Sequence, residues 1–150
     1  MGKIEAICIS SAKGTVKVPV AAAELRADHG IVGDAHAGPG HRQVSLLPGE
    51  SIAKVRVLMP GLGDGAFAEN LVTSGLDLST VAVGDRVRIG ADVDLEVTQI
   101  GKKCHHGCAI RQITGDCIMP REGVFCRVVT GGRLEQGADV ALLRSRNLDV

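Results

Sequence analysis

The segment from Val97 to Arg127 combines the residue types that most often carry chemistry. It holds four of the five cysteines and two of the five histidines, and its five basic side chains oppose only Asp116 and Glu122. A positive environment lowers the pKa of a thiol, and the thiolate attacks electrophiles, carries sulfur or binds metal. The composition therefore predicts a reactive or metal-binding cysteine in a pocket that also holds an anion.

The spacing of the cysteines in this segment leaves other chemistries open. Three, eight and eight residues separate Cys104, Cys108, Cys117 and Cys126, whereas the paired cysteines of a structural zinc site are usually about two to four residues apart. The alternatives are a zinc site in which a neighbouring histidine replaces a thiolate, a redox disulfide between Cys104 and Cys108, and four unreactive thiols.

Some of the cysteines fit a hydrophobic core better than a reactive site. The opening residues alternate in a period of two, which places Ile4, Ala6 and Cys8 on one face of a strand. Cys126 lies two positions from a valine on either side, on the same strand face. We therefore expect Cys8, Cys117 and Cys126 to pack inside the protein, as small apolar residues do.

A second group of potential ligands lies in the glycine-rich stretch from residue 28 to residue 41, whose composition predicts a surface loop. Its candidate ligands for a hard metal or for zinc are Asp28, His29, Asp34, His36 and His41. Their spacing matches no metal motif with a known geometry. The alternative is a loop shaped by glycine turns and side-chain hydrogen bonds.

Two further segments offer polar side chains. Residues 42–47 alternate polar and apolar, which predicts a strand that presents Arg42, and with it Ser45, to an anion; Arg42 could equally be an ordinary surface charge. Asn70 follows Phe67 and Glu69 closely in the chain. Its amide would either lock a loop through hydrogen bonds or point into the pocket.

The remaining sequence predicts a scaffold of short strands between glycine turns. Period-two alternation predicts strands at residues 83–90, 93–98 and 124–129 and a last strand around Val140. The helical spacing of apolar residues after Pro48 predicts a short helix over 49–57, and the alanine-rich residues 20–26 predict two helical turns. The chain is therefore expected to be mostly β, a small mixed or antiparallel β-barrel with one to three short helices, in a single domain over residues 1–150.

Composition excludes several classes of partner. Basic and acidic residues balance at 17 each, and with no Tyr or Trp and only two Phe the chain offers almost no stacking surface for nucleic acid bases. No uninterrupted apolar run reaches the roughly 18 residues of a membrane span, and the N-terminus lacks an export signal. We expect a cytoplasmic protein with reduced thiols, and the sequence leaves its oligomeric state open.

Six segments together resemble the MOSC family, the domain related to the C-terminal part of molybdenum cofactor sulfurases. They occur in family order and are GDAHAG (33–38), HRQVSLL (41–47), FAENLVTSGLDLS (67–79), VGDRVRIG (83–90), VTQIGKKCHHGC (97–108) and MPREGVFCRV (119–128). The resemblance spans nearly the whole chain. It implies a strand-rich barrel, in agreement with the alternation described above.

The resemblance also implies a cysteine that carries sulfur as a persulfide or coordinates the molybdenum of a pterin cofactor. Cys108, within Gly107 to Ile110, matches the position of the family cysteine and is the first candidate both for the reactive thiol and for the metal ligand. Cys104 is the second candidate. The expected positive field for a pterin phosphate, and the neutral donors beside it, come from Lys102, Lys103, Arg111 and Arg42 and from Ser45 and Asn70.

The cofactor that the resemblance implies is the molybdenum cofactor, molybdopterin, and the implied partner is a protein of its biosynthesis or a sulfur donor. A stand-alone member could be a cofactor carrier, a sulfur relay, a sulfurtransferase or a small C–S lyase; the zinc module is the structural alternative. Pyridoxal phosphate is not expected, because the chain lacks the aminotransferase-like part of the sulfurases and a matching lysine motif.

Overall fold

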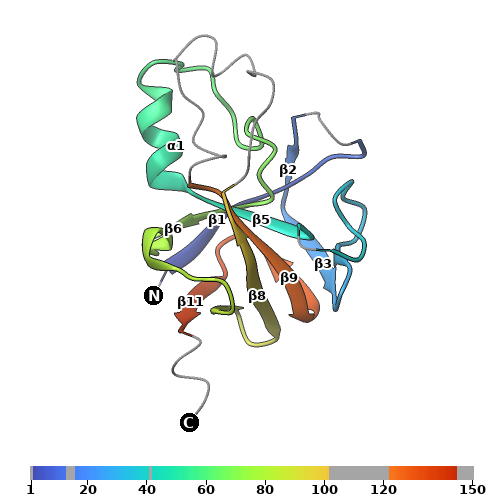
Figure 1. Cartoon of the computed structure of the whole chain (residues 1–150). Coiled ribbons are helices and arrows are strands. Elements are labelled where there is room, and N and C mark those ends of the chain that lie inside the picture. The colour runs from blue at the N-terminus through green and yellow to red at the C-terminus, as the bar shows by residue number, and fades with distance from the viewer. Residues whose placement is uncertain (1, 13–15, 41, 102–121, 145–150) are drawn as a thin grey trace.

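The computed structural model describes residues 2–12, 16–40, 42–101 and 122–144, which form a strand-rich domain (Figure 1). Its elements are β1 (Gly2–Ile9), β2 (Val18–Val20), β3 (Ala22–Arg26), β4 (Gly30–Ile31), β5 (Val44–Pro48), α1 (Gly49–Arg56), β6 (Leu71–Ser74), the 3-10 helix η1 (Leu78–Thr80), β7 (Arg86–Ile89), β8 (Val93–Ile100), β9 (Val124–Thr130), β10 (Gly132–Glu135) and β11 (Asp139–Leu143).

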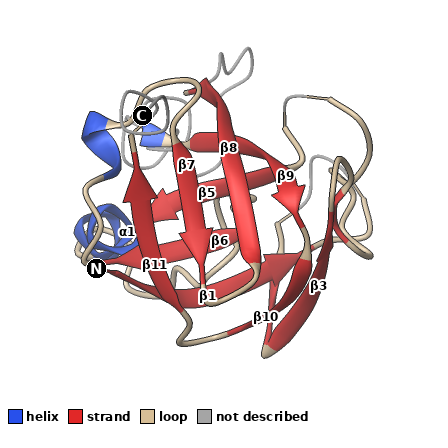
Figure 2. Ribbon diagram, turned by 90° about the horizontal axis from the view of Figure 1, so that it is seen from below, coloured by secondary structure: helices blue, strands red, loops and turns tan. Residues whose placement is uncertain are grey.

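The main sheet closes on itself. Its strand order is β11-β7-β8-β9-β5-β6-β1-β2, and β1 also pairs with β11, so seven strands form a closed barrel (Figure 2). The short strand β2 extends the sheet beside β1. A separate sheet of β10, β3 and β4 lies on the side away from α1. The predicted fold class, a small mixed β-barrel with few short helices, is confirmed.

One strand pair of the barrel is parallel. β5 and β6 run in the same direction, while the other printed pairings are antiparallel. A parallel pair requires a crossover connection, and the chain makes it through α1 and the loop that follows. Pro48 is the N-cap residue of α1 and has an extended backbone, so the predicted helix near residue 49 is confirmed.

The apolar residues form two clusters on opposite faces of the barrel wall. The interior cluster includes Ile4, Ile7 and Cys126, and the outer cluster, between the wall and α1, includes Ala6 and Cys8. A β-bulge between Ile4 and Ala6 separates the two faces. The expected face shared by Ile4, Ala6 and Cys8 is therefore wrong, because the extra residue of a bulge reverses the alternation.

The alanine-rich stretch is also not a helix. Ala22–Arg26 forms β3, which pairs with β10 on one side and with β4 on the other. Alanine favours helices intrinsically, but such a preference of well under 1 kcal/mol per residue is easily exceeded by strand pairing and burial. Leu25 shows this directly, because it is 2% exposed inside the barrel core.

A buried ion pair ties the loops on one side of the barrel together. Lys17 Nζ lies 2.7 Å from Asp34 Oδ1, and both side chains are completely buried. The ammonium group also donates to Ser10 Oγ at 3.1 Å and lies 3.1 Å from His36 Nδ1. Asp34 additionally accepts from the backbone N–H groups of Ser10 and His36. The loop between β1 and β2 and the loop after β4 therefore meet at one ammonium group.

The backbone around Lys17 is equally constrained. Its N–H donates to the carbonyl of Gly65 at 2.9 Å. Gly65 has φ of +90°, and a Cβ on it would lie 2.0 Å from the Lys17 carbonyl oxygen. Only glycine fits this close approach between the two segments.

Replacing Lys17 with methionine should strongly destabilise the fold, because it leaves the Asp34 carboxylate buried without its cation. We expect the free energy of unfolding to fall by about 3 to 5 kcal/mol, the usual cost of removing one member of a buried ion pair. Urea denaturation measures the loss. The control is Lys3→Met: Lys3 and its partner Asp139 are 58% and 54% exposed, so the change should be about 1 kcal/mol or less. Equal losses in both variants would refute a special role for the buried pair.

The dependence of stability on pH is a second readout of this variant. Burial alone would raise the pKa of Asp34, but the hydrogen bond and charge of Lys17 and two backbone donors lower it below its ordinary value. The stabilisation is therefore complete above the unfolded-state pKa of about 3.9 and is lost as the pH falls through the lower folded-state pKa. Without Lys17, burial should raise that pKa, and the loss should begin at a higher pH.

Candidate functional site

Both cysteines in the described part of the chain are core residues. Cys8 and Cys126 are 0% exposed. Burial, with the nearby charges of Glu69 and Asp64, raises the pKa of the Cys8 thiol to about 12, and burial beside Glu96 raises the pKa of Cys126 even further. Both thiols stay protonated at neutral pH, which makes them poor nucleophiles. The predicted core placement of these two cysteines is confirmed.

The segment expected to carry the chemistry lies outside the described residues. It spans residues 102–121 and contains Cys104, Cys108, Cys117, Lys102, Lys103 and Arg111, so the roles assigned to these residues stay predictions. The structure does describe where this segment leaves and rejoins the barrel. Gly101 N–H donates to the Gly123 carbonyl at 2.7 Å, and Ile100 pairs with Val124. The pairing of β8 with β9 therefore holds the two ends of the segment side by side.

Arg42 lies next to these ends. Its guanidinium carbon is 5.4 Å from the centre of the Phe125 ring, which is a cation–π distance. Its Nε donates to Gln99 Oε1 at 3.1 Å, and Gln99 in turn donates to the Gly101 carbonyl at 2.8 Å. No described residue accepts a hydrogen bond from the two terminal nitrogens of Arg42. An exposed, oriented guanidinium with open donors suits an anion such as a phosphate.

Ser45 and Asn70 hydrogen-bond to each other. Asn70 Oδ1 accepts from the Ser45 N–H at 3.0 Å and from its hydroxyl at 3.3 Å, while the Asn70 N–H donates to Ser45 Oγ at 3.0 Å. The Asn70 amide donates to the Cys8 carbonyl at 3.0 Å, and Ser45 and Asn70 are 5% and 1% exposed. In this arrangement they join β5 to β6 and β1. Their contact with a cofactor stays a prediction.

Glu69 locks the loop before β6. It is 0% exposed and accepts from the N–H groups of Gly65 and Phe67 at 2.9 and 3.0 Å. Burial raises the pKa of this carboxyl in spite of the lowering effect of its backbone donors. Of the two interpretations for Glu69 and Asn70, the structure shows loop locking through hydrogen bonds.

The glycine-rich loop is organised by turns and hydrogen bonds. Gly30, Gly33, Gly38 and Gly40 all have positive φ, and Asp34 is buried with Lys17 rather than exposed as expected. Among the residues that the structure describes, no three His, Cys, Asp or Glu side chains are arranged to hold a metal ion. His41 lies outside these residues.

Sequence reasoning missed three residues that shape this region. Lys17 follows no motif and lies between two valines. Gln43 is 0% exposed and joins Asp28 to the backbone of Val128 through its side-chain amide; its place within the alternating residues 42–47 was the available signal. Phe125, which supports Arg42, gave no signal beyond its aromatic type.

A family model, described as the MOSC domain, matches residues 33–141, most of the chain. The chain belongs to the MOSC domain family. This family is associated with the molybdenum cofactor, and the matched range includes Arg42, Ser45, Asn70 and the whole 102–121 segment. In the described part of this MOSC domain, no helix has the length and apolar character needed to cross a membrane.

Solved structures share the fold of this MOSC domain. The YuaD protein from Bacillus subtilis superposes with a TM-score of 0.77 at 19% identity, covering 95% of this chain and 96% of that chain. YiiM from Geobacillus stearothermophilus gives 0.68 at 20% identity, covering 99% and 82%. YiiM from Escherichia coli gives 0.62 at 19% identity, covering 97% and 74%. At these identities the likeness establishes the fold alone.

One curated relative is a much longer protein. A protein from Gibberella moniliformis named "Reductase" is 35% identical over 83 residues, which are 50% of this chain and 15% of that protein. The match therefore covers about half of this chain and a small part of that relative.

Replacing Asn70 with alanine should destabilise this MOSC domain by about 3 kcal/mol, because the change removes the side-chain partner of the buried Ser45 N–H and hydroxyl and of the Cys8 carbonyl. Chemical denaturation measures the loss. The matched control is Gln136→Ala, since Gln136 also donates to a β1 carbonyl, that of Glu5, but at an exposed position; a loss of about 0.5 kcal/mol or less is expected there. Similar values for both variants would contradict the locking role of Asn70.

Proposed function

We propose that this MOSC domain is a molybdenum-cofactor-associated protein that binds the molybdenum–pterin cofactor, carries sulfur on a reactive cysteine, or does both in turn. The observation that supports this most directly is the contrast between the cysteines. The family match includes Cys104 and Cys108, whereas Cys8 and Cys126 are buried and have raised pKa values. The proposal assigns the reactive thiol to Cys108, with Cys104 second.

The charge distribution around the segment supports the same proposal. Residues 102–121 include Lys102, Lys103 and Arg111, and a basic environment favours the thiolate. Arg42 lies where the described chain meets this segment, through its hydrogen bond to Gln99. Arg42 would hold the phosphate of the pterin by charge-assisted hydrogen bonds. The bound cofactor would supply the redox and sulfur chemistry of its molybdenum.

The family association favours the cofactor over a structural zinc ion. Cys126 lies in the interior core cluster of the barrel, and among the described residues it belongs to no group of three His, Cys, Asp or Glu that could hold a metal ion. A zinc site would then have to be built from the histidines and the other cysteines of residues 102–121. Molybdenum and zinc contents of the purified protein distinguish the two directly.

The thiol assignment predicts a clear order of reactivity. In the native protein, a thiol-specific reagent should modify Cys108 or Cys104 first, with an apparent pKa below the free value of about 8.5. Cys8 and Cys126 should react only after unfolding, because both are buried. Mass spectrometry after timed labelling gives the order of modification, and the variants Cys108→Ser and Cys104→Ser show which thiol reacts first.

After co-expression with the proteins of molybdopterin biosynthesis, the Cys108→Ser variant should also lose its molybdenum or its persulfide. Stoichiometric zinc with protected thiols would overturn the proposal.

The role of Arg42 predicts weaker binding of the cofactor when its charge is removed. Arg42→Gln should lower the affinity for molybdopterin about tenfold, since a charge-assisted hydrogen bond is worth about 1.5 kcal/mol or more. The control is Arg88→Gln, an exposed arginine on β7, which the sheet order separates from β9 by β8. Pterin fluorescence after cofactor release measures occupancy. Equal retention by both variants would exclude Arg42 as a phosphate ligand.

A further inference from the structure

A β-bulge lies near the end of β8. Val97 has Cys126 as its partner on β9 and Gln99 has Phe125, so two steps along β8 match one step along β9. The extra residue is Thr98, whose hydroxyl donates to the Phe125 carbonyl at 3.1 Å. Bulges often lie beside functional sites, where they change the direction in which a side chain points.

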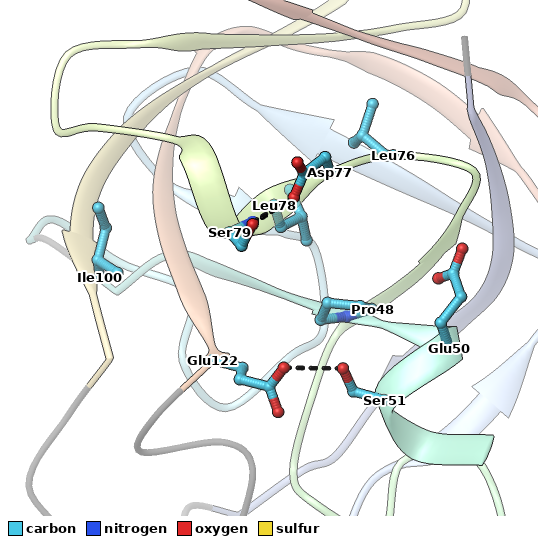
Figure 3. Close-up of a pocket in the computed structure, with 9 residues that line it drawn as sticks. All are labelled: Pro48, Glu50, Ser51, Leu76, Asp77, Leu78, Ser79, Ile100 and Glu122. Atoms are coloured by element: carbon cyan, nitrogen blue, oxygen red, sulfur yellow. Dashed lines mark hydrogen bonds between the residues drawn. The ribbon is translucent and has the colours of Figure 1, made fainter. Parts of the chain in front are cut away.

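The bulge turns Gln99 away from the barrel interior. The apolar side chains at positions 93, 95 and 97 belong to the interior cluster, and unbroken alternation would place the side chain of residue 99 with them. Gln99 instead contacts Arg42, an exposed residue. The residue after it, Ile100, lines a pocket between α1 and η1 (Figure 3). The backbone of β8 therefore brings a polar amide to the Arg42 guanidinium.

Two partners fix the orientation of the Gln99 amide. Its Oε1 accepts from Arg42 Nε at 3.1 Å, and its Nε2 donates to the Gly101 carbonyl at 2.8 Å. An arginine N–H can only donate and a carbonyl can only accept, so the reversed amide would satisfy neither partner. Gly101 is itself held, because its N–H donates to the Gly123 carbonyl at 2.7 Å. This series of hydrogen bonds anchors Arg42 to the backbone at the barrel edge.

Gln99 holds Arg42 without cancelling its charge. Most of the described arginines pair with a carboxylate; these are Arg56, Arg86, Arg127, Arg133 and Arg144. Arg42 takes part in none of the ion pairs between described residues. The contrast is clearest on β8, where Glu96 Oε1 accepts from the Nε of Arg127 at 2.7 Å. The same atom of Arg42 meets a neutral amide, which leaves the positive charge for a ligand.

The use of Nε by Gln99 also determines how an anion can bind. A guanidinium can bind an oxyanion through its two terminal nitrogens, or through Nε and one terminal nitrogen. The second mode is closed in this arrangement, because the Nε–H of Arg42 is donated to Gln99. An oxyanion would therefore meet the two terminal nitrogens.

We propose that Gln99 is the positioning residue of an oxyanion site at Arg42: its neutral amide directs the two terminal guanidinium nitrogens to a phosphate group and leaves their charge intact. The inference rests on the proposed function, in which Arg42 holds the phosphate of the cofactor, and it adds a residue that acts through Arg42. A glutamate in place of Gln99 would hold Arg42 but cancel its charge. An apolar residue would keep the charge but lose the orientation.

The test compares Gln99→Glu and Gln99→Met in the full chain, with inorganic phosphate as the probe. NMR detects the Arg42 Nε–H signal, which Arg42→Gln assigns, and phosphate should shift this signal in the parent protein. Gln99→Glu keeps the acceptor but adds a negative charge, so phosphate affinity should fall about tenfold. In Gln99→Met the charge remains, so affinity should fall about threefold. The Nε–H of Arg42 should then exchange faster with water, because it has lost its acceptor.

Gln136→Glu is the matched control. Gln136 also donates its side-chain amide to a backbone carbonyl, that of Glu5 on β1, at an exposed position, and β6 separates β1 from β5 in the sheet. The control adds the same charge and removes the same kind of donor, so its phosphate affinity should be close to that of the parent. Equal losses in Gln99→Glu and Gln136→Glu would overturn the proposal.

The Nε–H signal separates positioning from a merely structural role. Gln99→Glu should combine weak phosphate binding with a slowly exchanging Nε–H, whereas a general loss of structure would speed exchange and weaken binding together. Parent-like affinity in Gln99→Glu, or an unchanged Nε–H signal in Gln99→Met, would refute the role of Gln99.

Failure of this inference can be distinguished from failure of the proposed function. If phosphate shifts the Arg42 signal equally in the parent and in Gln99→Glu, only the role of Gln99 fails. If phosphate leaves Arg42 unaffected in the parent, the oxyanion site fails and the inference fails with it. The cysteine chemistry depends on neither result, because thiol labelling measures it separately.

Discussion

Closure of the barrel is the constraint on which the rest of the structure depends. The first long strand, β1, pairs with the last, β11, and a barrel of about this strand number is filled by its own side chains. The interior cluster of valine, leucine and isoleucine shows that this one is filled. In the described part of the chain, the barrel interior is therefore a packed apolar core.

Closure also explains why Cys8 and Cys126 are poorly placed for chemistry. Cys126 points into the filled interior, and Cys8 lies in the outer cluster with Phe67 and Phe125. Both are enclosed by the packing that the barrel requires. The pairing of β8 with β9 ends at Gly101 and Gly123, so residues 102–121 form the connection between the two strands. The remaining cysteines thus belong to a connection whose ends are fixed by the sheet.

The strands could be predicted where local pattern and tertiary environment agree. Val93, Leu95 and Val97 alternate with half-buried polar residues along β8, and sequence alone reveals that period. Alternation could not reveal the bulge in β1, which depends on its pairing with β6. The strand β3 could not be predicted either, because partners far along the chain override the preference of alanine for helices.

The residues of the candidate site also divide into those that local sequence reveals and those that depend on partners far along the chain. Burial of Cys126 follows from strand alternation, whereas Cys8 is buried on the outer face, in the cluster that includes Ile52 of α1. The family motifs identified Arg42, Ser45 and Asn70 as residues of interest. Sequence could not show that Ser45 and Asn70 satisfy one another, since 25 residues separate them. Lys17 was missed for a related reason. A lysine becomes a buried anchor only when a carboxylate is brought to it, and Asp34 reaches Lys17 from a loop 17 residues away.

The end of β8 sends its last two side chains to different surroundings. Successive residues of a strand point to opposite faces. Gln99 accepts a hydrogen bond from Arg42, which lies over the Phe125 ring, while the next residue, Ile100, lines the pocket between α1 and η1 (Figure 3). The last two residues of this strand therefore place one polar and one apolar side chain directly before residue 101.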